Sequence, residues 1–267
     1  MRPRALLPAL MLAGCAVAAP GMVGIPALGV TLQAQYVQPA AATGPAVIAL
    51  HGCGGLFPAR DAQWRDLLAG SGHAVVLPDS FASRGLGSQC KTPSRTVSPN
   101  RERRADAVAT AEWLAVQPGT PPGGAVVMGW SNGGSTALAA AGQGVMPAGL
   151  VRGYVAFYPG CRAVLERGTW SPAGPILIVM GEDDDWTPAA PCRALAARFP
   201  DRITLVLYPG AYHDFDVPNR PIVVRTGLAF TAHGDGTAHA GTNEAGRAAA
   251  LAFVPRWIAA LPPARAS

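Results

Sequence analysis

Charged residues are scarce in this sequence, and the patterns that mark several other classes of protein do not occur in it. Only 14% of the 267 residues are charged and 49% are hydrophobic, which is enough for a substantial buried core. The net charge is +5, but no nucleic-acid-binding motif accompanies it, so we expect no nucleic-acid partner. The sequence has no internal repeat and no Cys-x-x-Cys pair, so we expect one domain and no metal or cofactor.

The N-terminus has the layout of an export signal. Residues 1–4 are basic, and the apolar run that follows, 5–13, is too short to span a bilayer. Leu-Ala-Gly-Cys at 12–15 is similar to a bacterial lipobox, in which Cys15 would carry a lipid anchor. The alternative is ordinary cleavage near 16–18, which would remove Cys15. We therefore expect a signal peptide at 1–20, a tether at 21–44 and a single exported domain at 45–262, periplasmic or held at the membrane by the lipid.

Four further cysteines are consistent with export, because disulfides persist in oxidising compartments. Cys53 follows one predicted strand and Cys90 lies in the loop after the next, while Cys161 and Cys192 follow a later pair of strands. Neighbouring parallel strands end at the same edge of a sheet, so topology favours the pairs Cys53–Cys90 and Cys161–Cys192. These pairs close loops of 37 (90 − 53) and 31 (192 − 161) residues, and each would stabilise the fold by roughly 3–4 kcal/mol.

Short apolar runs alternate with amphipathic segments along the chain. Continuous apolar runs of this kind are typical of parallel strands buried on both faces. The sequence therefore predicts an α/β fold with a mostly parallel central sheet and helices on both faces. We expect strands at 46–50, 74–77, 125–130, 150–158, 175–180 and 203–208, an irregular strand at 30–37, and helices at 61–70, 100–117 (capped by Asn100), 132–141, 189–199 and 243–261.

The stretch around Ser131 joins a predicted strand to a predicted helix. The apolar run 125–130 ends in Gly-Trp-Ser-Asn-Gly-Gly at 129–134, and small helix formers follow at once. This layout is typical of a nucleophile elbow, where Gly129 and Gly133 would allow the turn to close tightly. The start of the helix also offers free N–H groups and a positive dipole end to a developing oxyanion. A glycine-rich turn without chemistry could contain the same short pattern, so Ser131 needs partners.

An acid and a histidine follow Ser131 in the order Ser, Asp, His, each after a predicted strand. The two segments are Gly-Glu-Asp-Asp-Asp-Trp-Thr-Pro at 181–188 and Tyr-Pro-Gly-Ala-Tyr-His-Asp-Phe at 208–215. A serine hydroxyl is a poor nucleophile at neutral pH, so a histidine must accept its proton and an acid must orient that histidine. His213 is the candidate base, and the acid lies near 184. His233 and His239 are expected to be surface histidines.

The motifs at 51–55 (His-Gly-Cys-Gly-Gly), 129–134, 181–188 and 208–215 together resemble the dienelactone hydrolase family of α/β-hydrolases, over roughly 45–260. The resemblance implies the α/β-hydrolase fold. It assigns Asp184 as the acid and His213 as the base, and leaves the neighbouring aspartates as loop or capping residues. It also implies that the backbone N–H groups of Cys53 and Asn132 would bind the oxyanion.

The sequence departs from this family at the nucleophile, because the namesake enzymes use a cysteine where this chain has Ser131. That substitution indicates a broader serine esterase that acts on a small-molecule carboxylic ester or lactone. Family members hold the dienelactone carboxylate with arginines, and Arg84 is the positional candidate here. Trp130 and Trp186 are further candidate substrate contacts. The basic residues between 84 and 104 form either a solvated surface or a funnel for anionic substrates.

Two other functions fit the same motifs. The triad could serve a peptidase or a thioesterase, or the protein could be a non-catalytic lipoprotein that binds a ligand on a hydrolase scaffold. An intact set of Ser131, Asp184 and His213 argues against a retired site, which would tolerate loss of the serine or the histidine. The sequence does not indicate the oligomeric state.

Overall fold

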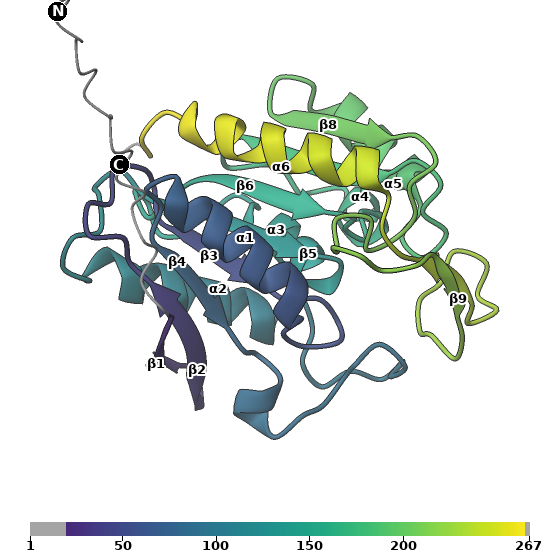
Figure 1. The fold of residues 1–267 in the computed structure, drawn as a ribbon, viewed down its shortest axis with the longest axis horizontal. Coiled ribbons are helices and arrows are strands. Elements are labelled where there is room, and N and C mark those ends of the chain that lie inside the picture. Colours follow the sequence, from purple (N-terminus) through teal and green to yellow (C-terminus); the bar gives the residue numbers. More distant parts are fainter. Residues whose placement is uncertain (1–19, 265–267) are drawn as a thin grey trace, which may run out of the picture.

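The computed structural model describes residues 20–264, which form an eight-stranded sheet flanked by helices (Figure 1). The strand order is β1-β2-β4-β3-β5-β6-β7-β8. From β4 to β8 all neighbours are parallel, whereas β2 pairs antiparallel with both β1 and β4. The predicted α/β fold is confirmed. The strands are Gly21–Ala27 (β1), Val30–Val37 (β2), Val47–Leu50 (β3), Val75–Pro78 (β4), Ala125–Trp130 (β5), Val151–Phe157 (β6), Ile176–Gly181 (β7) and Ile203–Tyr208 (β8).

Helices cover both faces of the sheet. α1 and α6 contact each other on the face nearer the viewer in Figure 1, while α2 and α3 pack together. The connection from β3 through α1 to β4 runs toward one edge of the sheet, and the connection from β4 through α2 to β5 runs toward the other edge. Because crossovers between parallel strands are right-handed, α1 and α2 lie on opposite faces of the sheet. The helices are Pro58–Gly70 (α1), Glu102–Ala115 (α2), Asn132–Ala140 (α3), Arg162–Glu166 (α4), Ala189–Arg198 (α5) and Glu244–Ala259 (α6), with a 3-10 turn at Ala82–Arg84 (η1).

The central strands are buried from end to end. Every residue of β3, β4, β5 and β7 is buried, because helices cover both faces of this part of the sheet. Complete burial explains the continuous apolar runs, and each fully buried Val, Leu or Ile side chain contributes about 1.5–3 kcal/mol. The carboxyl ends of these strands therefore form a rigid edge from which loops emerge.

The predicted tether at 21–44 is wrong over most of its length. Gly21–Ala27 and Val30–Val37 form a hairpin that extends the main sheet, and β2 pairs with β4. Ile25, Leu32 and Ala34 are fully buried in the core. The Gly- and Pro-rich composition suggested a linker, but the inward side chains of the hairpin find apolar partners on α2. The strand at 30–37 was predicted correctly, whereas the signal peptide and Cys15 lie outside the described residues, apart from residue 20.

The predicted helix cap at Asn100 is wrong, whereas a residue with no predicted capping role, Asn243, caps a helix. Asn243 caps α6, because its Oδ1 accepts the N–H of Gly246 at 2.8 Å. Asn100 does not cap α2, which begins one residue later with Arg101 as N-cap and no side-chain cap. Instead, the Glu102 carboxylate in the first turn of α2 accepts a hydrogen bond from the Ser98 N–H at 2.9 Å. The helix dipole favours a negative charge at this end of the helix.

Both predicted disulfides are present. Cys53 pairs with Cys90, and Cys161 pairs with Cys192. Each bond joins segments that follow neighbouring strands, β3 with β4 and β6 with β7, and Cys192 lies in α5. The sequence-based topology was therefore sufficient to choose one pairing among three.

A small second sheet forms in the segment 216–242, whose order the sequence did not reveal. β9 (Val223–Arg225) pairs antiparallel with β10 (Ala238–Ala240), and this region projects from the domain in Figure 1. Backbone hydrogen bonds tie it down, from Gly241 to His213 and from Ala229 to Cys90. Among the described helices, none is long and apolar enough to cross a membrane.

Candidate active site

Ser131 lies in a strained turn between β5 and α3. Its φ of 53° and ψ of −113° are uncommon for a residue with a side chain. A Cβ atom at Gly129 would come within 2.3 Å of the Gly133 carbonyl oxygen, and one at Gly133 within 2.0 Å of the Leu50 oxygen. Only glycine fits at these two positions, so the predicted elbow has a steric origin.

His213 and Asp184 meet Ser131 at the carboxyl edge of the sheet. His213 Nε2 lies 2.9 Å from Ser131 Oγ, and His213 Nδ1 lies 2.8 Å from Asp184 Oδ2. The exposed fractions of Ser131, Asp184 and His213 are 8%, 3% and 1%. The three residues come from the loops after β5, β7 and β8, so packing of the sheet sets their spacing. In this arrangement the Nδ1–H group of His213 donates a hydrogen bond to the Asp184 carboxylate, and Nε2 accepts a hydrogen bond from the Ser131 hydroxyl.

The loop that carries Asp184 holds its carboxylate in one orientation. Asp184 Oδ1 accepts the backbone N–H groups of Trp186 at 2.9 Å and Thr187 at 2.8 Å. Burial disfavours the imidazolium form of His213, but the charge of Asp184 and its hydrogen bond outweigh burial and raise the pKa of His213. The histidine is thus poised to take up a proton.

Asp185 has a partner of its own, although it is adjacent to Asp184. Its carboxylate accepts the His239 N–H at 2.8 Å and lies 2.7 Å from His239 Nδ1. The His239 ring stacks on Tyr212 with centroids 4.7 Å apart. Asp185 therefore anchors β10 beside the site, which agrees with a loop role, and His239 is partly exposed as predicted but paired.

The backbone N–H groups of Cys53 and Asn132 flank Ser131 without a partner of their own. Within residues 20–264, neither N–H donates to another protein group, and both residues line a cavity with Ser131. The Cys53 loop is shaped by His51, whose Nδ1–H donates to the Gly52 oxygen at 2.8 Å. Its Nε2 accepts the Ser80 N–H at 3.1 Å. Burial, together with the nearby charge of Arg103, lowers the pKa of His51 well below its usual value, so this ring is neutral.

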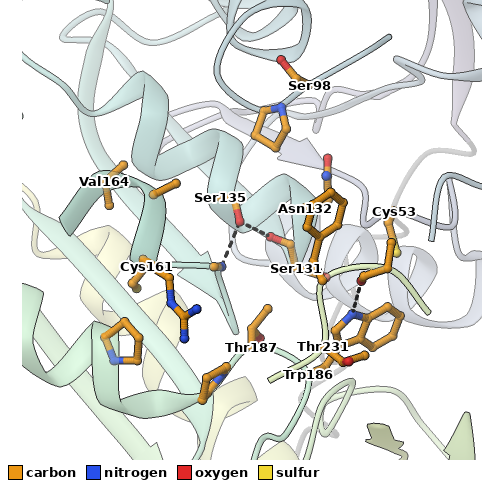
Figure 2. A pocket seen from close by; sticks show the side chains of 18 of the residues that line it. Cys53, Ser98, Ser131, Asn132, Ser135, Cys161, Val164, Trp186, Thr187 and Thr231 are labelled. Carbon is orange, nitrogen blue, oxygen red and sulfur yellow. Dashed lines mark hydrogen bonds between the residues drawn. The ribbon is translucent and has the colours of Figure 1, made fainter. Parts of the chain in front are cut away.

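Two cavities meet at Ser131. The larger has a volume of about 540 Å³, and Figure 2 shows Ser131, Asn132, Cys53 and Trp186 on its wall. The smaller, of about 160 Å³, is bordered by Ser131, His213 and Trp186. Much of the rest of the larger cavity is apolar, from Val164, Pro188, Pro191, Ala229, Phe230 and Ala232. A substrate bound at Ser131 can therefore extend in two directions.

Three arginines line the smaller cavity. Arg60 is buried and hydrogen-bonds Asp61 through Nη2 at 2.9 Å. Arg220 and Arg225 share one carboxylate, that of Asp214, at 3.7 Å and 3.8 Å. Two guanidinium groups facing one carboxylate leave an excess of positive charge beside Ser131. Among residues 20–264, no group of His, Cys, Asp or Glu side chains is arranged to hold a metal ion.

Two of the predicted substrate contacts point elsewhere. Arg84 makes two hydrogen bonds to Asp106, at 2.7 Å and 2.8 Å, and does not line either cavity. Trp130 is fully buried, because its side chain faces the core at the end of β5. Trp186 lines both cavities, and its ring centroid lies 4.7 Å from that of His213. Position in the chain was therefore sufficient for Trp186 but did not reveal the direction of the Arg84 and Trp130 side chains.

A buried carboxylate that the sequence did not identify supports the loop of His213. Asp216 has no exposed surface and accepts three hydrogen bonds. They come from Trp64 Nε1 at 2.7 Å, Trp130 Nε1 at 2.9 Å and the Tyr158 hydroxyl at 2.7 Å. The donors belong to α1, the end of β5 and the residue after β6, so one carboxylate joins three elements to the segment three residues past His213.

Comparison with known proteins adds a family context. The sequence profile described as the dienelactone hydrolase family matches residues 32–257. Among proteins with curated descriptions, none matches the sequence significantly.

Solved structures share the fold at low sequence identity. A candidate dienelactone hydrolase from Klebsiella pneumoniae is 18% identical with a TM-score of 0.66, over 90% of this chain and 98% of its own. A lidless α/β serine hydrolase from Xanthomonas campestris is 17% identical with a TM-score of 0.55, over 73% of this chain and 86% of its own. A Pyrococcus furiosus esterase is 16% identical with a TM-score of 0.58, over 79% and 90%.

Replacing Asp216 by alanine should destabilise the protein strongly. The change leaves three buried donors without an acceptor, and each orphaned donor costs about 1–3 kcal/mol. We expect a loss of at least about 3 kcal/mol in the free energy of unfolding, measured by urea denaturation. Asp66→Asn, which breaks only the surface pair with Arg65, is the matched control and should cost no more than about 1 kcal/mol. Equal stability of the two variants would refute the structural role of Asp216.

Proposed function

The chain belongs to the dienelactone hydrolase family, and on this basis we propose that it is a serine hydrolase that cleaves carboxylic esters or lactones through an acyl-enzyme. One observation carries the proposal: the hydrogen-bonded series from Ser131 through His213 to Asp184. Family membership supports a hydrolase, and the series supports a serine as its nucleophile in place of the cysteine of the namesake enzymes.

In the first half of the reaction, Ser131 Oγ attacks the substrate carbonyl carbon while its proton passes to His213 Nε2. Asp184 stabilises the imidazolium that forms and keeps the ring oriented. The carbonyl oxygen becomes an oxyanion, which accepts hydrogen bonds from the N–H groups of Cys53 and Asn132. When the tetrahedral intermediate collapses, the bond to the leaving oxygen breaks and His213 returns the proton to that oxygen.

In the second half, water releases the acyl group by the same steps. His213 takes a proton from the water as its oxygen attacks the acyl carbon, and the proton then returns to Ser131 Oγ. An ester yields an acid and an alcohol, whereas a lactone yields a single hydroxy acid. Apart from the substrate and water, these reaction steps use only groups of the protein.

The arginines of the smaller cavity favour substrates that carry an anionic group near the scissile bond. The excess positive charge of Arg220 and Arg225 lies next to Ser131 and His213. A guanidinium group binds a carboxylate through two N–H donors, which would orient the substrate. The larger cavity would take the rest of the substrate.

Export remains our proposal for the location of the enzyme. Two disulfides in the described domain are consistent with an oxidising compartment, and the lipobox-like segment at 12–15 suggests a lipid anchor at Cys15.

A fluorophosphonate probe should label the wild-type protein at Ser131. Ser131→Ala should abolish labelling, because the activated oxygen is lost. Ser135→Ala is the matched control and should still be labelled, since the Ser135 hydroxyl donates to the Ser131 carbonyl oxygen and not to a histidine. Labelling measured by in-gel fluorescence decides the question. A folded, disulfide-intact wild type that fails to react would exclude a serine hydrolase and favour the ligand-binding lipoprotein.

The rate should depend on pH through His213. Only neutral imidazole accepts the serine proton, so kcat/KM should fall as the pH drops through the raised pKa of His213. Asp184→Asn removes the charge that raises this pKa, so the ascending limb should move to lower pH and kcat should fall by about 10³–10⁴-fold. Asp183→Asn, an exposed neighbour, should change neither quantity. A pH profile unchanged by Asp184→Asn would contradict the assigned acid.

Arg225→Gln should weaken the binding of anionic esters selectively. We expect KM for a 4-nitrophenyl hemisuccinate to rise about tenfold or more, because a hydrogen bond to a charged group contributes about 1.5–3 kcal/mol. KM for 4-nitrophenyl butyrate, of similar length but neutral, should stay within about twofold. Arg65→Gln, in α1 and outside the lining of both cavities, serves as the control. Parallel changes in KM for both esters would argue against an anion-binding cavity.

A further inference from the structure

Arg103 is a fully buried cation beneath the candidate active site. It lies in the first turn of α2 and has no exposed surface. Its guanidinium carbon lies 5.0 Å from the centroid of the Phe81 ring, and Phe81 packs against the His51 ring. Burial lowers the pKa of Arg103 to about 9. The fold therefore keeps a charged group where an apolar side chain would be easier to accommodate.

The two ends of the guanidinium group bind two different loops. Nη1 donates to the side-chain oxygen of Asn132 at 2.5 Å, and Nη2 donates to the backbone oxygen of His51 at 2.8 Å. Asn132 directly follows Ser131, and His51 lies two residues before Cys53. Arg103 thus connects the two segments whose N–H groups face Ser131.

No carboxylate neutralises Arg103 through a hydrogen bond in the described part of the chain. Asp106, one turn along α2, makes both of its side-chain hydrogen bonds to Arg84 instead. Nε of Arg103 is buried without an acceptor. Both acceptors of Arg103 are neutral oxygens, and the carboxylates of Asp106 and Asp79 act on its charge only without a direct hydrogen bond. An oxyanion at Ser131 would be stabilised by this buried positive charge.

We propose that Arg103 is a positioning residue of the oxyanion hole, which holds the Cys53 and Asn132 segments in register and adds a fixed positive charge behind them. The inference rests on the proposed function of Ser131. Interactions of this kind strengthen as charge develops on the oxygen, so they lower the barrier more than they stabilise bound substrate. Arg103 therefore affects kcat, whereas Arg220 and Arg225 affect KM.

Hydrolysis of 4-nitrophenyl acetate by Arg103 variants tests this role. For Arg103→Met we expect kcat to fall about 10²-fold, comparable to the loss of one oxyanion donor, with KM within about threefold of wild type. Arg103→Lys keeps the charge but cannot span both acceptors, so its kcat should be intermediate. Affinity for phenylboronic acid, whose tetrahedral adduct with Ser131 carries an anionic oxygen, should fall in parallel with kcat/KM.

Arg152→Met is the matched control. Arg152 also bridges two backbone oxygens, those of Gly124 and Pro122, but at the opposite end of the sheet, so its loss should lower stability without changing kcat. If Arg103→Met does not fold, Arg103→Lys and Asn132→Ala test the positioning role instead. Asn132→Ala removes the side-chain acceptor of Arg103 and keeps the backbone N–H donor of residue 132. Their effects on kcat should be non-additive.

The possible failures are distinguishable. Folded Arg103 variants with wild-type kcat and boronate affinity would overturn the inference while the wild type remains a serine hydrolase. A wild type that neither reacts with fluorophosphonate nor hydrolyses esters would overturn the proposed function first.

Discussion

The carboxylate of Asp216 is the contact on which the geometry of the site depends most. It accepts hydrogen bonds from two indoles and a phenol that belong to three different elements, and it lies three residues beyond His213. A loop after a surface strand is normally mobile, but here a fully buried anion with three donors binds it to the core. The approach of His213 to Ser131 follows from this attachment and not from local sequence alone.

Steric contacts and a crosslink fix the other parts of the site. Glycine at 129 and 133 lets the strained turn of Ser131 press against the Leu50 carbonyl. The Cys53–Cys90 disulfide holds one candidate oxyanion donor, and the Cys90 carbonyl accepts the N–H of Ala229 from a segment that lines the larger cavity. Crosslinks of this kind reduce the reorganisation needed during the reaction, which is how a preorganised polar site lowers a barrier.

Substitution of serine for cysteine changes what the triad must accomplish. A thiolate forms readily near neutral pH, whereas a serine hydroxyl needs a base within hydrogen-bond distance at the moment of attack. In the mechanism we propose, the 2.9 Å contact between His213 and Ser131 and the raised pKa of His213 would meet this need. Three arginines border the smaller of the two cavities beside Ser131, and under the proposed function the anionic end of a substrate would lie there.

The sequence by itself determined the features that depend on short-range sterics and periodicity. Apolar runs identified the central strands, the spacing of glycines identified the elbow at Ser131, and the order of strands paired the four cysteines correctly. Only the tertiary structure decided which distant side chains meet. Asp216 and its three donors, the Asp185–His239 pair 54 residues apart, and the inward turn of Trp130 depend on how separate segments pack. Strand β1 at 21–27 belongs to the same group, because an edge strand with weak local signals forms only where a neighbour, here β2, pairs with it.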